Sequence, residues 1–128
     1  MKMIVRNPTS GIYPATADYV HALEVQSAQR FLFVSGTMGL DHSGAPGKTL
    51  EEQLDLIWAN IRTILASADM CVDNIVRLTS YLTDSTFAEA NAKARVAALR
   101  GRVIPTTAVV VKTLDACWLV EIEVIAMA

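Results

Sequence analysis

Six short stretches of the chain have the hydrophobic patterns of β-strands, which are period-two alternation or a brief run of β-branched and aromatic residues. They lie at residues 3–5, 19–25, 31–34, 75–82, 107–111 and 118–126. Only the polar segment 26–29 separates the second stretch from the third, so we expect these two to pair as a hairpin. In the last stretch Glu121 and Glu123 alternate with hydrophobic residues and therefore share one face of the strand.

Two further stretches repeat hydrophobic residues every three or four positions, as amphipathic helices do. The first runs from Leu50 to about Asp69, and Thr49 before it is a suitable N-cap. The second follows Asp84, ends near Gly101, and has a buried side made mostly of alanines. The order β-β-β-α-β-α-β-β predicts an α+β fold with both helices on one face of a sheet. We expect a single domain that spans residues 1–128.

Composition and charge narrow the functional classes. The chain is 52% hydrophobic and only 19% charged, so we expect part of its apolar surface to be buried against a partner. Its net charge is −2 and it has no cluster of basic residues, which argues against nucleic-acid binding. No stretch has the length of a membrane span, and the N-terminus has no cleavage signature, so a cytoplasmic location is expected.

Few residues suit a metal or redox site. Cys71 and Cys117 are too few and too far apart for a disulfide framework or a zinc motif, and Cys117 lies in an apolar run that predicts burial. His21 and His42 have neither an i, i+4 partner nor a cluster of carboxylates, as a metal centre would need. We therefore expect neither a metal nor a cofactor.

Four segments together resemble the Rid family, also called the YjgF or L-PSP endoribonuclease-like family. They are Phe33–Gly36; the first helix with Gln53 and Asn60; Arg77–Asp84 with the following Phe87, Ala88 and Asn91; and Val120–Ala126. The resemblance implies a mixed β-sheet with two helices packed on one face, as in chorismate-mutase-like folds. It also implies a homotrimer that binds a small molecule in each cleft between subunits. Active members of the family hydrolyse enamines and imines to a keto acid and ammonia.

The same resemblance assigns the site residues of this chain. The catalytic carboxylate falls on Glu121, and the ligand-contacting positions fall on Tyr19, Ser35, Gly36, Asn91 and Thr107. Thr107 occupies the place where the family has an arginine that holds the substrate carboxylate. A hydroxyl replaces a guanidinium fork there, and losing such a charge-assisted hydrogen bond costs about 1.5–3 kcal/mol. Carboxylate-bearing imines are therefore less favoured as substrates, unless Arg102 reaches the cleft.

Three functions remain open from the sequence. The first is a hydrolase or deaminase of a small imine, enamine or related metabolite, without the arginine clamp. The second is a non-catalytic trimeric module that binds a small molecule or a partner, and the third, less favoured, is an endoribonuclease. The sequence also leaves open whether Glu121 or Glu123 faces the cleft, because the two share one face of the strand.

Overall fold

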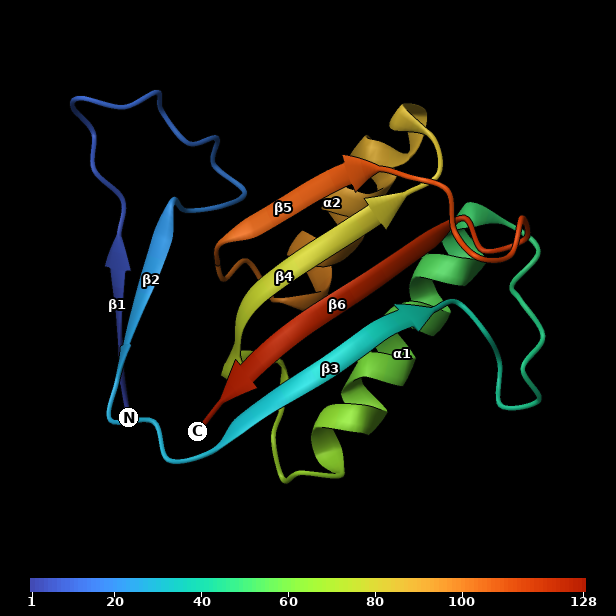
Figure 1. Cartoon of the computed structure of the whole chain (residues 1–128), viewed down its shortest axis with the longest axis horizontal. Coiled ribbons are helices and arrows are strands. Elements are labelled where there is room, and N and C mark those ends of the chain that lie inside the picture. The colour runs from blue at the N-terminus through green and yellow to red at the C-terminus, as the bar shows by residue number, and fades with distance from the viewer.

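A four-stranded sheet forms the centre of the computed structural model, which describes all 128 residues (Figure 1). Across the sheet the strands are β3 (Phe31–Met38), β6 (Val120–Met127), β4 (Ile75–Leu82) and β5 (Thr106–Val110). β6 is antiparallel to both of its neighbours, whereas β4 and β5 are parallel. The sheet is therefore mixed.

Both helices cover the same face of this sheet, behind it in Figure 1. They are α1 (Leu50–Ala66) and α2 (Ala88–Ala98), and two 3₁₀ turns, η1 (Val72–Asn74) and η2 (Ser85–Phe87), precede β4 and α2. Thr49 caps α1, because its Oγ1 accepts the backbone N–H of Glu52 at 3.1 Å. The predicted α+β architecture, with two helices packed on one sheet face, is confirmed.

The main core lies between the helices and the sheet. From α1 it takes Leu54, Ile57 and Ile61, which are at most 3% exposed. Every second residue of β6 from Val120 to Ala126 points into it and is at most 1% exposed. Burying one such aliphatic side chain stabilises the fold by about 1.5–3 kcal/mol, which fixes which side of β6 faces inward. The other side lies on the face that no helix covers, called here the open face.

The N-terminal strands stand apart from this sheet (Figure 1). β1 (Lys2–Arg6) and β2 (Ala22–Gln26) pair antiparallel with each other and with no other strand. The predicted hairpin between residues 19–25 and 31–34 is therefore wrong: β3 pairs instead with β6, near the end of the chain. The short connection did not decide the pairing: beside β6, Val34 of β3 joins the core that the helices cover.

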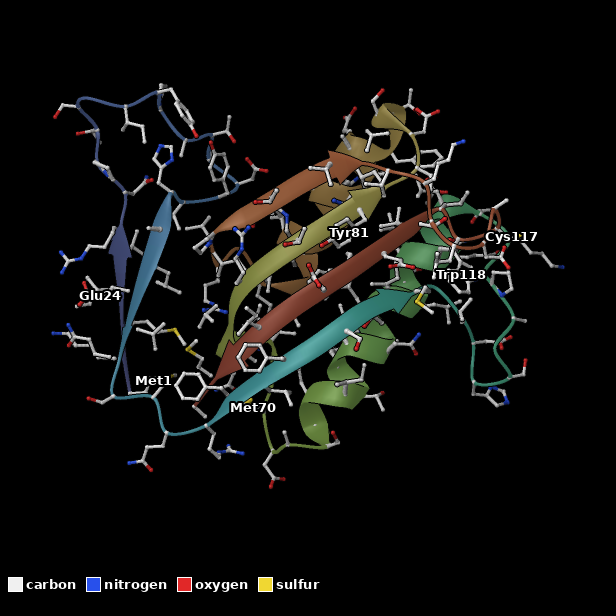
Figure 2. The ribbon with its side chains drawn as sticks, in the orientation of Figure 1. Met1, Glu24, Met70, Tyr81, Cys117 and Trp118 are labelled. Atoms are coloured by element: carbon white, nitrogen blue, oxygen red, sulfur yellow. The ribbon has the colours of Figure 1, made fainter.

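Neither helix has the length and apolarity needed to cross a membrane. The segment between β5 and β6 is a loop. Cys117 lies in this loop and is exposed, which corrects the expectation that it is buried (Figure 2). Asp115 makes a local turn here, since its Oδ1 accepts the backbone N–H of Cys117 at 2.8 Å. The apolar run that suggested burial begins only with the strand itself.

Candidate functional site

A β-bulge in β3 shapes the first part of the candidate site. Val34 is opposite Val124 and Thr37 is opposite Ile122, so β3 has one residue more than β6 between these pairs. Val34 and Thr37 are both buried on the helix side. The two residues between them are thereby left outside the core: Gly36 lies on the open face and Ser35 is exposed at the sheet edge.

The carboxylate of Glu121 lies directly over Gly36. A Cβ atom added to Gly36 would be 2.7 Å from Glu121 Oε2, so only glycine leaves room for the carboxylate in this position. Glu121 is on the open face of β6, paired with Met38 on one side and Tyr81 on the other. None of the three ion pairs of the chain includes Glu121. Its oxygens are therefore available to a water molecule or a ligand.

Glu123, two residues along the same face, is already engaged. The hydroxyl of Tyr81 donates a hydrogen bond to Glu123 Oε1, and Figure 2 shows Tyr81 on the open face of β4. This hydrogen bond raises the pKa of Tyr81, and the desolvation and negative charge around it add to the effect. Of the two glutamates that the sequence could not distinguish, Glu121 is thus the one with a free carboxylate.

Thr107 lies on the open face of β5 and accepts a hydrogen bond from an arginine on the next strand. The donor is Nη2 of Arg77, at 2.7 Å from Thr107 Oγ1. Thr107 pairs with Thr79, so the arginine reaches it diagonally across the β4–β5 pair. The position where the resemblance expects an arginine thus has a guanidinium beside it, contributed by β4.

Arg102, the other arginine considered for this role, is bound elsewhere. Its Nη2 donates to the backbone carbonyls of Val72, at 3.0 Å, and of Ile75. Burial lowers the pKa of Arg102. Arg102 therefore ties the turn after α2 to the start of β4, and the hypothesis that it reaches the cleft is not supported.

Tyr19 lies in the loop before β2 rather than in a strand, and its neighbour Asp18 fixes this loop to α2. Asp18 Oδ2 is 2.6 Å from Arg95 Nη2, and its carbonyl accepts from Nη1 at 2.7 Å. Nη1 also lies 3.3 Å from Thr106 Oγ1, next to the candidate Thr107. The hydroxyl of Thr16 and, less strongly, Arg95 lower the pKa of Asp18, although its partial burial opposes them. Arg95 thus links the Tyr19 loop to the start of β5.

Asn91 is not on the open face. It lies on α2, one turn before Arg95, and is only 3% exposed between the helix and the sheet. Its Oδ1 has no hydrogen-bond partner. Within one chain the structure therefore brings Gly36 and Glu121 together, and places Asn91 on the other side of the sheet. A ligand contact of Asn91 stays a prediction.

Two polar residues of α1 hold the strands that carry Gly36 and Glu121. Gln53 Nε2 donates to Cys117 O at 2.8 Å, and Gln53 Oε1 accepts the N–H of Leu119 at 2.9 Å. Asn60 Nδ2 donates to Leu40 O at 2.9 Å, just beyond the end of β3. These bonds anchor the end of β3 and the start of β6 to the same helix, which positions the glycine under the carboxylate.

Hollows lie on both sides of the Gly36–Glu121 contact. One of about 650 Å³ runs along β3, where Ser35 and Gly36 face Asn60 and the 40–44 loop. The other, of about 260 Å³, is lined by Glu121, Tyr81 and residues 111–114. No group of three or more His, Cys, Asp or Glu side chains is placed to hold a metal ion.

Three residues important to this arrangement received no role from the sequence: Arg77, Tyr81 and Arg95. Alternation along residues 75–82 does place Arg77 and Tyr81 on one face. Their partners, however, depend on the register between neighbouring strands, which alternation does not define. The alanine-rich stripe of α2 gave no sign that a buried arginine lies on its sheet-facing side.

Comparison with known proteins gives a family match over most of the chain. The model of the family described as Endoribonuclease L-PSP matches residues 11–128. The chain is similar to the mitochondrial protein MMF1 of Saccharomyces cerevisiae, with 32% identity over 80 residues, which are 61% of this chain and 53% of that protein. It is also similar to the RutC family protein YjgH of Escherichia coli, with 31% identity over 59% of this chain and 56% of that protein. The chain thus spans about half the length of these relatives.

A solved structure resembles the chain over its full length. It is YyfB of Yersinia pestis, a protein of unknown function from the conserved Rid family. The two share 26% sequence identity, the match covers 100% of both chains, and the TM-score is 0.83. The fold and the family-model match therefore agree.

Proposed function

This chain belongs to the endoribonuclease L-PSP family, the YjgF or Rid family, and on that premise we propose that it hydrolyses a small imine or enamine. The observation that carries the proposal is the free Glu121 carboxylate over Gly36, on a sheet face that no helix covers. In this proposal Ser35, Gly36, Tyr19, Asn91 and Thr107 contact the ligand.

Glu121 acts as a general base in the proposed reaction. A water molecule gives a proton to its carboxylate and attacks the C=N carbon, so that a C–O bond forms as the C=N π bond breaks. Glu121 then passes that proton to the nitrogen, which gives an N–H bond and restores the carboxylate. The tetrahedral carbinolamine then loses ammonia and leaves a carbonyl group. An enamine enters the same route after protonation of its β-carbon. The overall change is imine plus water to carbonyl compound plus ammonia.

We propose that the site is completed by neighbouring copies in a homotrimer. The open face carries exposed apolar residues, among them Phe31 at 55% and Phe33 at 74% exposure. Such a surface favours burial against a partner, and a second copy over it would shield Glu121 from bulk water. We propose a cytoplasmic location as well, which agrees with the two free, exposed cysteines.

The charge of the open face supports a small-molecule substrate. Glu121, Glu123 and Arg77 lie on it, so carboxylates outnumber the guanidinium. A polyanionic RNA backbone needs several cations along its path. This favours the hydrolase over the nuclease that the family name mentions.

The test is hydrolysis of freshly generated imines by the purified protein, with ammonia release as the readout. The panel holds 2-iminopropanoate and larger imines, and the variants are Glu121→Gln, Glu123→Gln and Thr107→Arg. We expect turnover by wild type and a loss of at least about 100-fold in Glu121→Gln, the lower range for a general base. Glu123→Gln is the matched control, since it removes the carboxylate that Tyr81 already engages.

Light scattering of each variant measures its molecular mass and so shows whether the proposed trimer forms. If no imine is hydrolysed by wild type or by Thr107→Arg, the hydrolase proposal fails and a non-catalytic binding module becomes the better description. Equal losses in the two glutamine variants would instead refute the assignment of Glu121.

A further inference from the structure

We propose that the hollow between the C-terminal ends of α1 and α2 binds a small aromatic carboxylate, with its anionic group at Arg62. The hollow lies on the helix side of the sheet (Figure 1), away from the Gly36–Glu121 contact. A trimer that covers the open face would leave this hollow exposed to solvent. The proposal therefore depends neither on the proposed hydrolysis nor on the proposed assembly.

The hollow has the size and the lining of a small-molecule site. Its volume is about 480 Å³, and ligand pockets commonly have about 300–1,000 Å³. Arg62 and Arg100 are the charged residues of the lining. The other lining residues are hydrophobic and come from both helices and from the segment after α1: Ala66, Met70, Cys71, Val72, Ala97 and Ala98.

The hydrophobic part of the lining favours an aromatic body. Met70 and Val72 are only 6% and 7% exposed, so they form the inner side of the hollow. The alanines on the two helices extend no further than a methyl group, which leaves room for a flat ring between the helices. A methionine sulfur makes favourable contacts with the edge of an aromatic ring, and Met70 supplies such a sulfur.

Arg62 is the free cation of the hollow. It is exposed on α1, and no side-chain hydrogen bond or ion pair of the chain includes it. The residues one turn before and after it, at positions 58, 59, 65 and 66, are all uncharged. Its planar guanidinium is therefore available to hold a carboxylate through two parallel hydrogen bonds.

The second arginine limits the charge of the ligand. Arg100 Nη2 is 2.8 Å from Asp73 Oδ1, so this guanidinium is already paired with a carboxylate. The lining thus has one uncompensated positive charge, which suits a monoanion. A carboxylate carries one negative charge at neutral pH, whereas a phosphate monoester carries about 1.5–2. The carboxylate is therefore the better match.

The helix ends around the hollow have few free carbonyl groups that could repel an anion. The Leu65 carbonyl, at the end of α1, accepts the backbone N–H of Met70 at 3.0 Å. The Val96 carbonyl, near the end of α2, accepts the backbone N–H of Gly101 at 3.0 Å. Such capping bonds satisfy terminal carbonyls that carry the negative end of a helix dipole. A carboxylate at Arg62 is thus attracted by the guanidinium without strong opposition from the backbone.

The test measures how fast Cys71 and Cys117 of the full chain react with iodoacetamide, a neutral alkylating agent. Both thiols are free and exposed, but only Cys71 lines this hollow. We expect 3-phenylpropanoate to slow the alkylation of Cys71 in a saturable manner and to leave that of Cys117 unchanged. The neutral analogue 3-phenylpropanamide, at the same concentration, should leave both rates nearly unchanged.

Two variants separate the charge from the apolar walls. Arg62→Met should raise the concentration of 3-phenylpropanoate that gives half-protection by about fivefold, as expected for an ion pair that stays partly exposed to water. Lys48→Met is the matched control, because Lys48 is exposed just before the other end of α1 and has the same charge. Ala97→Leu keeps a strong helix former at an exposed position and fills the hollow, so protection should be lost.

Thermal melts of each variant show that it is folded before its protection is compared. The proposal is overturned if 3-phenylpropanoate does not protect Cys71 of wild type, or if the amide protects it equally. Equal slowing of Cys71 and Cys117 would place the effect outside the hollow and would also overturn it. The same holds if Arg62→Met and Lys48→Met need equal concentrations for half-protection, or if Ala97→Leu is protected like wild type.

Discussion

Replacing Gly36 with alanine should displace the Glu121 carboxylate while leaving the stability of the fold nearly unchanged. The new Cβ would lie 2.7 Å from Glu121 Oε2, against an ordinary contact of at least 3.4 Å. Its next contacts, with Cδ and Cβ of Glu121, are at 3.6 and 4.0 Å and need no change. The clash is therefore with the flexible end of a side chain, which can rotate away.

The expected effect on folding is small. A side chain displaced from its rotamer costs about 0.5–1.5 kcal/mol. Removing glycine from a strand returns about 0.5–1 kcal/mol of backbone entropy. Gly36→Ala should therefore shift the free energy of unfolding by less than about 1 kcal/mol, and the Tm by no more than about 5 °C.

Turnover should respond much more strongly. Displacing a catalytic group by about 1 Å costs on the order of 100-fold in rate. The assay is imine hydrolysis by wild type, Gly36→Ala, Glu121→Gln and the double variant, with thermal melts of all four. Because alanine acts through Glu121, it should change nothing further in the Glu121→Gln background. Full activity in Gly36→Ala, or an equal loss in both backgrounds, would refute this reasoning.

Other residues give predictions of different kinds. Gly39→Ala should destabilise the fold by about 1–3 kcal/mol in thermal melts, because its Cβ would lie 2.5 Å from the backbone of α1, which cannot move aside. The lowered pKa of Asp18 means that its contribution to stability is present at neutral pH and is lost as the pH falls through the folded pKa, below about 4. In acid denaturation, the free energy of unfolding of Asp18→Asn should therefore fall less over this pH range than that of wild type. The raised pKa of Tyr81 means that the hydrogen bond to Glu123 stabilises the fold at neutral pH and that this stabilisation is lost above about pH 10. An ultraviolet titration should show one tyrosine that ionises later than the others, and this late transition should be missing in Tyr81→Phe. A late transition that this variant leaves unchanged would contradict the bond to Glu123.

The parts of the fold that follow from local patterns were predictable. The period of α1, its Thr49 cap and the inward face of β6 can all be inferred from residues within one element. The pairing of the strands could not be inferred in this way. β2 pairs with β1 across a 15-residue connection and β3 pairs with β6 from the other end of the chain, and alternation gives a strand's faces without its neighbours.

In the candidate site, too, the sequence predicts which residues share a face of a strand but not which residues of neighbouring strands they contact. Glu121 and Glu123 are equivalent in sequence because they share a face, and only the register with β4 gives Tyr81 to Glu123. The absence of an arginine at Thr107 suggested a lost cation, whereas the parallel pairing of β4 and β5 brings Arg77 to the same hydroxyl. A function that depends on contacts between strands is thus only partly encoded in any one segment.

The separate pairing of β1 and β2 has a consequence for how the molecule opens. All strand hydrogen bonds of this hairpin are made within the first 26 residues, so it can come loose as one unit while the β3–β6–β4–β5 sheet stays intact. In native-state hydrogen–deuterium exchange its amides should exchange well before those of α1 or β6. The loop with Tyr19 lies between β1 and β2 but is tied to α2 through Asp18 and Arg95, so its amides should exchange more slowly than those of the two hairpin strands.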